Sequence, residues 1–180
     1  MHSTPTRTKQ FGKPRLWTLA LISLLTGSIL TGVANADENG DTKMKIIRKA
    51  DQEAAQGPEE YFTGKATIKG FFAREEPSRL TGAIVTFEPG ARTAWHKHPL
   101  GQTLIVTDGI GWTQVEGEEK VEFHEGDIML CPKDKKHWHG ATPDSSMTHI
   151  ALQESLDGKN VEWLEKVTDE EYLAGTPKKD

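Results

Sequence analysis

Short β-like segments separated by turn-forming residues recur along most of this 180-residue chain, and no other feature restricts its fold as strongly. Turn signals such as Glu88-Pro89-Gly90, Asp108-Gly109 and Glu125-Gly126 separate one segment from the next. Regular spacing of this kind predicts an all-β sandwich or barrel. Strands are expected at residues 45–48, 66–73, 82–88, 93–98, 103–107, 111–115, 121–124, 127–131, 137–141 and 147–154.

Helical structure is expected in two short places. Residues 58–62 suit a single turn. Residues 168–173 begin with Thr168, an N-cap residue, and continue with three acidic residues, which stabilise the first turn of a helix. Residues 44–180 therefore form one predicted β domain with an N-terminal arm and a short C-terminal helix.

The first 36 residues have the pattern of a secretory signal peptide. Four basic residues and no acidic ones precede a mostly apolar run at 16–33, and Ala34-Asn35-Ala36 follows. We expect cleavage after Ala36, a flexible lead-in at 37–43, and general export to the periplasm or the medium without stable membrane association. An uncleaved signal anchor is the alternative, because about 18 apolar residues approach a minimal membrane span.

The net charge of the chain argues against nucleic-acid partners, and its cysteine content rules out an intrachain disulfide. Removing the four basic leader residues from 22 leaves 18 Lys and Arg against 27 Asp and Glu, a net charge of −9. Such a chain is not expected to bind nucleic acid. Cys131 is the single cysteine, so an intrachain disulfide is excluded, and a buried, inert thiol is expected at the end of its apolar run.

One histidine constellation carries the candidate chemistry. His96 and His98 form a His-x-His on a β-like run, so both imidazoles face the same side of the strand. Gln102 opens the next strand after a turn, and His137 begins a later one. Three imidazoles and an amide oxygen make a plausible donor set for a divalent ion, with coordination positions left for a substrate.

These residues resemble the two motifs of the cupin superfamily. The first motif matches at Gly90, His96, His98, Gln102 and Gly109. The second matches at Gly126, Pro132, Asp134 and His137. The resemblance implies a conical barrel of two antiparallel sheets, of a kind that usually assembles into homodimers or homotetramers.

Two positions depart from the cupin pattern. Asp134 stands where most cupins have glycine at a turn, and aspartate tolerates the left-handed conformation in part. Gln102 stands where most cupins have glutamate. A neutral amide leaves the ion's full charge in place, which favours Lewis-acid chemistry and anionic ligands over higher oxidation states.

Over residues 44–173 the chain closely resembles the small bacterial manganese cupins described as hydroxynitrile lyases. That resemblance implies that His96, His98, Gln102 and His137 bind one metal ion per chain, manganese in the family, and that His149 is the acid/base residue. It implies a small-molecule substrate, with (R)-mandelonitrile cleaved to benzaldehyde and hydrogen cyanide. The donor types also admit iron, nickel, cobalt, zinc or copper.

The sequence also predicts the environment of several residues around these histidines. His149 is expected to keep a pKa near 6.5, and His139 to line the cavity or lie on the surface, with ligation as an alternative. His124 is expected at the surface. Trp95 and Trp138 should pack outside the cavity, against the second sheet or a partner subunit. Ala83, Val85 and Phe87 are expected to line the pocket, because they alternate on one strand.

Two rival functions share the same open metal site. One is a dioxygenase of the quercetinase type, which consumes oxygen. The other is a binding or sensing protein that captures a small anion without turnover. The motif alone does not separate these classes from a lyase.

Overall fold

The computed structural model describes residues 44–175 and residue 177, so the expected leader (1–36) and lead-in (37–43) lie outside the described residues. The chain forms the elements η1 (Lys49–Asp51), β1 (Ala55–Gln56), β2 (Phe62–Thr63), β3 (Ala66–Ala73), β4 (Leu80–Phe87), β5 (Arg92–Thr93), β6 (His96–Lys97), β7 (Gln102–Val115), β8 (Val121–His124), β9 (Ile128–Cys131), β10 (His137–Ala141), β11 (Met147–Glu154), β12 (Glu162–Trp163) and α1 (Asp169–Leu173). Within this part of the chain, no helix is both long and apolar enough to cross a membrane.

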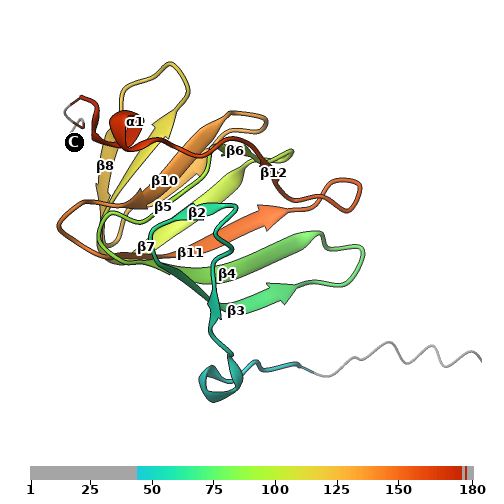
Figure 1. Cartoon of the computed structure of the whole chain (residues 1–180). Helices are drawn as coiled ribbons and strands as arrows, with labels where there is room; N and C mark the ends of the chain where they lie inside the picture. Colours follow the sequence, from blue (N-terminus) through green and yellow to red (C-terminus); the bar gives the residue numbers. More distant parts are fainter. Residues whose placement is uncertain (1–43, 176, 178–180) are drawn as a thin grey trace, which may run out of the picture. The chain divides into compact units, whose positions relative to one another are not determined.

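Antiparallel strands form two sheets that share the long strand β7 (Figure 1). In the first sheet the order is β1-β3-β4-β11-β7-β9. The second sheet holds β2, β5, β10, the far half of β7 and β8; β6 pairs with β10, and β12 pairs with β6. The all-β prediction is confirmed, as are the strands at 66–73, 121–124, 137–141 and 147–154.

Strand β7 is one continuous strand where the sequence predicts two strands and a turn at Asp108-Gly109. Gly109 has a φ of 77°, and a Cβ atom there would lie 1.9 Å from the carbonyl oxygen of Ser146. Glycine therefore lets the strand bend without ending. Residues before the bend pair with β11, and residues after it pair with β10 and β8, so the bend carries the chain from one sheet to the other.

Two other strand predictions are corrected. Residues 45–48 form no strand and are exposed, and the strand that pairs with β3 at this edge of the sheet is β1. Residues 93–98 are divided between β5 and β6. At the interruption, the amide of Trp95 donates to Glu165 and its carbonyl accepts from Leu164, so the C-terminal segment takes these hydrogen bonds.

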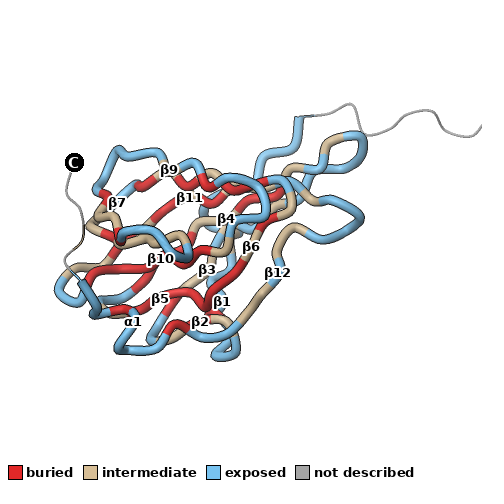
Figure 2. Tube along the Cα trace, turned by 90° about the horizontal axis from the view of Figure 1, so that it is seen from above, coloured by how far each residue is buried: buried red, intermediate tan, exposed pale blue. Residues whose placement is uncertain are grey.

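The main core lies between the two sheets, and Figure 2 shows buried residues along both β10 and β5. It contains Phe62, Ala66, Val85, Phe87, Ala91, Val106, Phe123, Ala141 and Met147. A second buried cluster on the outside of β10 joins Trp95 and Trp138 to Val167 and Tyr172 of the C-terminal segment. Both tryptophans thus pack outside the cavity as expected, and the C-terminal segment is what covers them.

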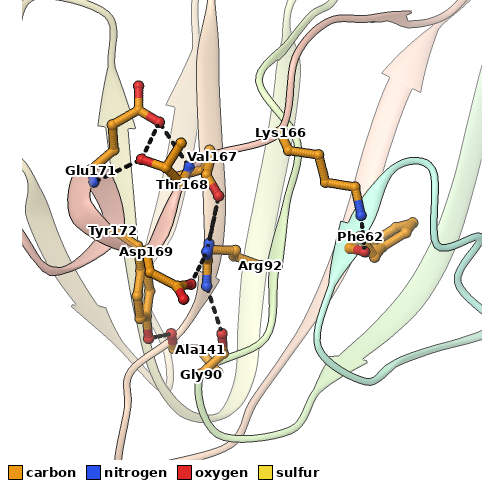
Figure 3. A network of polar contacts seen from close by, with 10 residues as sticks. All are labelled: Phe62, Gly90, Arg92, Ala141, Lys166, Val167, Thr168, Asp169, Glu171 and Tyr172. Carbon is orange, nitrogen blue, oxygen red and sulfur yellow. Dashed lines mark hydrogen bonds and ion pairs between the residues drawn. The ribbon is translucent and has the colours of Figure 1, made fainter.

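Helix α1 begins as predicted, and its capping box joins Thr168 and Glu171. Just before it, the guanidinium of Arg92 donates twice to the carbonyl of Val167, at 2.9 and 3.2 Å, and once to Asp169 at 2.6 Å (Figure 3). Arg92 also stacks over the ring of Tyr172 at 4.6 Å. These contacts hold the C-terminal segment against β5 and β10.

Candidate metal centre

The four predicted ligands come together at one end of the barrel. His96 on β6 is paired with His137 on β10, which places their ring centroids 4.2 Å apart. His98 follows β6, and its ring lies 5.1 Å from that of His96 and 5.6 Å from that of His137. Gln102, the first residue of β7, completes the group, and all four side chains are buried.

Backbone carbonyls orient the three imidazoles. Nδ1 of His96 lies 2.9 Å from the carbonyl oxygen of Ala94, Nδ1 of His98 lies 2.6 Å from that of Asn160, and Nδ1 of His137 lies 3.0 Å from that of Lys135. A carbonyl oxygen only accepts, so each Nδ1 carries the proton. Each Nε2 therefore keeps its lone pair, which is the form that binds a metal ion.

Lone pairs face one another in this centre. Nε2 of His137 lies 3.4 Å from Oε1 of Gln102, although neither atom carries a proton to share in this tautomer. Nε2 of His98 is buried and has no hydrogen-bonding partner among the described residues. Buried acceptors without a donor are unfavourable unless a cation meets them. The donor set therefore fits a divalent metal ion.

Burial keeps these histidines neutral. Loss of hydration lowers the pKa of His98 to about 4, and the same cause lowers the pKa of His96 well below its ordinary value and that of His137 below it. Neutral imidazole is the metal-binding form, so the site is ready for a metal at neutral pH.

His139 is buried beside the centre and does not lie on the surface. Among the described residues, the histidines whose ring nitrogens lie within 4.8 Å of one another are His96, His137 and His139, so these three can hold a metal ion, and His98 lies outside this group. His139 is buried and lines the cavity, which confirms one of the two expected positions and corrects the other. Its Nδ1 has no partner among the described residues.

His149 faces the same cavity from β11, where it pairs with Val85 on one side and Val106 on the other. Its ring lies 5.0 Å from that of His139. Neither of its ring nitrogens has a hydrogen-bonding partner in another described residue. Burial lowers its pKa to about 3, so the expectation of a value near 6.5 is wrong.

A cavity of about 210 Å³ opens beside these histidines. Ala83, Val85 and Phe87 line it as expected. The sequence does not reveal that Phe62 and Trp163 also line it. Trp163 reaches the site from the two-residue strand β12, where its ring packs 4.9 Å from that of His96. No periodic pattern marks so short a strand, so its position depends on tertiary pairing.

Three predictions outside the centre are confirmed. Asp134 has a φ of 58°, the left-handed conformation that its place in the second motif requires. His124 is exposed and pairs with Glu122. Burial raises the pKa of the Cys131 thiol to about 11, so it stays protonated and unreactive at neutral pH.

The chain is similar to known proteins in both sequence and fold. The family model described as "Cupin domain" matches residues 83–152. A protein of Granulicella tundricola named (R)-mandelonitrile lyase is 55% identical over 129 residues, which cover 72% of this chain and 98% of that protein.

Solved structures give the same result for the fold. A cupin-like protein from Thermotoga maritima has a TM-score of 0.62 and 39% identity over 66% of this chain and 90% of its own. The polyketide cyclase RemF from Streptomyces resistomycificus has a TM-score of 0.57 over 72% of this chain and 91% of its own. At 15% identity it shares the fold alone.

Proposed function

Since the chain belongs to the cupin family, we propose that it is a metal-dependent lyase that cleaves or forms hydroxynitriles. The reaction would convert (R)-mandelonitrile to benzaldehyde and hydrogen cyanide, or run in reverse. A relative with 55% identity carries the name (R)-mandelonitrile lyase. The observation that carries the proposal is the convergence of unprotonated histidine nitrogens and an amide oxygen beside an apolar cavity.

Four side chains would hold the ion: His96, His98, Gln102 and His137. A bound divalent ion supplies Lewis acidity toward an oxygen of the substrate. The neutral amide of Gln102 adds no charge, so the site keeps its attraction for an oxyanion. We propose manganese as the ion on the strength of the family resemblance.

His149 would move the proton. Its imidazole is neutral at neutral pH, and both ring nitrogens are without partners in other described residues. Burial makes this imidazole a weak base, so it would accept the hydroxyl proton of a cyanohydrin when a bound cation lowers the pKa of that hydroxyl. As the hydroxyl oxygen becomes the carbonyl oxygen, the bond to the nitrile carbon breaks and its electron pair leaves with cyanide. The imidazolium then returns the proton to cyanide, which leaves His149 neutral again.

The cavity suits a small aryl substrate. Phe62, Phe87 and Trp163 supply aromatic surface, while Ala83 and Ala151 leave room beside it. A volume of about 210 Å³ is below the range of roughly 300–1,000 Å³ that holds drug-sized ligands. This small volume therefore favours a compact substrate such as one with a single aromatic ring.

A direct assay tests the proposal. The chain from Asp37 onward, the form expected after export, is purified, stripped of metal and reloaded with manganese. Benzaldehyde and cyanide release from (R)-mandelonitrile is then compared with that of the metal-free protein. Metal-dependent release supports the lyase. No release above the metal-free control contradicts it, and oxygen consumption or ligand binding without product would identify the rival functions.

A further inference from the structure

Three polar side chains form one row across neighbouring strands beside the candidate metal centre. Gln153 on β11 pairs with Thr81 on β4 and with Gln102 on β7. Side chains at paired positions share a face of the sheet. Hydrogen bonds join all three, so the row leads from the buried hydroxyl of Thr81 to a predicted metal ligand.

Thr81 sets the direction of these hydrogen bonds. Its hydroxyl donates its single proton to the carbonyl oxygen of Gln153, at 3.0 Å. A carbonyl oxygen only accepts, so this direction cannot reverse. The hydroxyl oxygen is then left to accept, from Nε2 of Gln153 at 3.0 Å and from Nδ2 of Asn160 at 3.1 Å.

The hydrogen bonds at Thr81 also determine how the amide of Gln102 is oriented. Gln153 directs its amide nitrogen at Thr81, so its Oε1 is left to accept a hydrogen bond from Nε2 of Gln102 at 3.3 Å. The amide nitrogen of Gln102 is thereby turned away from the histidines. Its Oε1 lies 3.4 Å from Nε2 of His137.

A second branch runs from the same hydroxyl to His98. The side chain of Asn160 donates to Thr81, and the backbone carbonyl of Asn160 lies 2.6 Å from Nδ1 of His98. Thr81 therefore contacts both residues that orient His98 and Gln102, although it touches neither of them itself.

We propose that Thr81 is the positioning residue of the metal centre: its hydroxyl fixes which atom of the Gln102 amide faces the histidines and holds the residue that orients His98. The inference rests on the proposed metal site. An amide binds a cation through its oxygen, whereas its NH₂ group repels one, so a reversed Gln102 would remove one ligand.

Thr81→Val removes the hydroxyl at nearly constant shape. Metal-free protein is titrated with Mn²⁺ by calorimetry, and the variant is expected to bind about 10- to 100-fold more weakly than the wild type, as is typical when a group behind a ligand is lost. Thr81→Ser keeps the hydroxyl and should stay within threefold. Thr86→Val is the matched control, because Thr86 lies on β4 and its hydroxyl bonds Thr148 at 2.9 Å, away from the metal centre.

A second variant covers the case in which Thr81→Val does not fold. Gln153→Leu interrupts the row while leaving Thr81 in place, and it should weaken Mn²⁺ binding in the same direction. Unfolding of each metal-free variant, followed by circular dichroism, separates a general loss of structure from a local one. A loss of Mn²⁺ affinity at unchanged stability is the result that the proposal expects.

The outcomes separate this inference from the proposed function. If the wild type binds Mn²⁺ and releases benzaldehyde while Thr81→Val binds Mn²⁺ equally well, the positioning role is overturned and the lyase stands. If the wild type binds Mn²⁺ but lacks lyase activity, a weakened Thr81→Val still supports the positioning role. A wild type that binds no divalent ion overturns both.

Discussion

Individual histidines in the candidate centre differ in what holds them. Carbonyl oxygens of other residues fix the rings of His96, His98 and His137, whereas no hydrogen bond from another described residue holds Nδ1 of His139 or either ring nitrogen of His149. Rings fixed in one tautomer are prepared to act as ligands. Rings that no carbonyl oxygen of another residue fixes remain available for a substrate.

This difference separates two donor sets, one with His98 and Gln102 and one with His139. We expect His98→Ala to weaken Mn²⁺ binding by more than about 100-fold, because it removes an oriented ligand. His139→Ala should change it by less than about fivefold. Equilibrium dialysis with metal analysis measures both, and the reverse order of effects would favour the group His96, His137 and His139.

His149 should affect turnover and not metal content. His149→Ala is expected to lower kcat/KM for (R)-mandelonitrile by about 10²- to 10⁴-fold, the usual contribution of a positioned acid/base group. Its manganese content should match that of the wild type. His124→Ala, which changes an exposed histidine, serves as the control. Full turnover by His149→Ala would remove the proton-transfer role.

Among the elements, the C-terminal segment 160–174 contributes to the site although it carries none of the histidines. Asn160 orients His98 and Trp163 lines the cavity, while β12 pairs with β6. Farther along, Lys120 donates to the carbonyls of Tyr172 and Ala174 at 2.7 and 2.8 Å. The segment joins the barrel wall to the metal centre, so its anchoring and the site's geometry are linked.

Arg92 is the main anchor of that segment. Arg92→Met should lower the free energy of unfolding by about 3 kcal/mol, because it leaves the carbonyls of Val167 and Gly90 without their donor. Asp169→Asn removes only the partner charge, whose side chain is 86% exposed against 5% for Arg92, and should cost less than about 1 kcal/mol. Urea denaturation measures both, and equal losses would contradict this assignment.

At the scale of the whole molecule, five buried histidines in one region make stability depend on pH. At and above about pH 7 they are neutral in both the folded and the unfolded chain. As the pH falls through the ordinary pKa of 6.5, the unfolded chain takes up protons. His98 and His149 take them up in the folded state only near pH 4 and pH 3. Acid therefore favours unfolding.

We expect the free energy of unfolding of the metal-free protein to fall between pH 7 and pH 5. Each of His98 and His149 would contribute up to about 2 kcal/mol of this loss. Denaturant titrations at several pH values measure the effect. His149→Leu should reduce the loss, and a stability that is constant over this range would refute the explanation.

The outer face of the first sheet bears on assembly. Ile84, Ile150, Ile105 and Ile128 occupy paired positions across β4, β11, β7 and β9. On β9, the side chains of Ile128 and Leu130 are 62% and 72% exposed. Ile84, Ile105 and Ile150 are half-buried, so the row is an apolar surface that is most exposed at β9. Apolar surfaces of this kind are found at association sites. This row agrees with the expected homodimer or homotetramer, which stays a prediction.

Sedimentation equilibrium tests that prediction. The wild type should have a multiple of the single-chain mass, and the double variant Ile128→Lys/Leu130→Lys should shift toward the monomer, because buried lysine is costly at an apolar interface. Leu156→Lys, at an exposed position in the loop after β11, is the control. A monomeric wild type would show that this face does not join two copies.

The sequence by itself determined most strands, the common face of His96 and His98, the place of Gln102 at the start of a strand, and the turn at Asp134. These features follow from side-chain alternation and local backbone preference, which neighbouring residues settle among themselves. The continuous course of β7 was missed, because a bend and a turn both use glycine and only the pairing partners distinguish them.

Tertiary structure alone decided the rest. The lowered pKa of His149, the proximity of His139, the position of Trp163 and the direction of the hydrogen bonds from Thr81 to Gln102 depend on segments far apart in the sequence. Burial depends on what covers a residue, and a hydrogen-bonded row depends on the register between strands. Spacing along a single strand contains neither quantity.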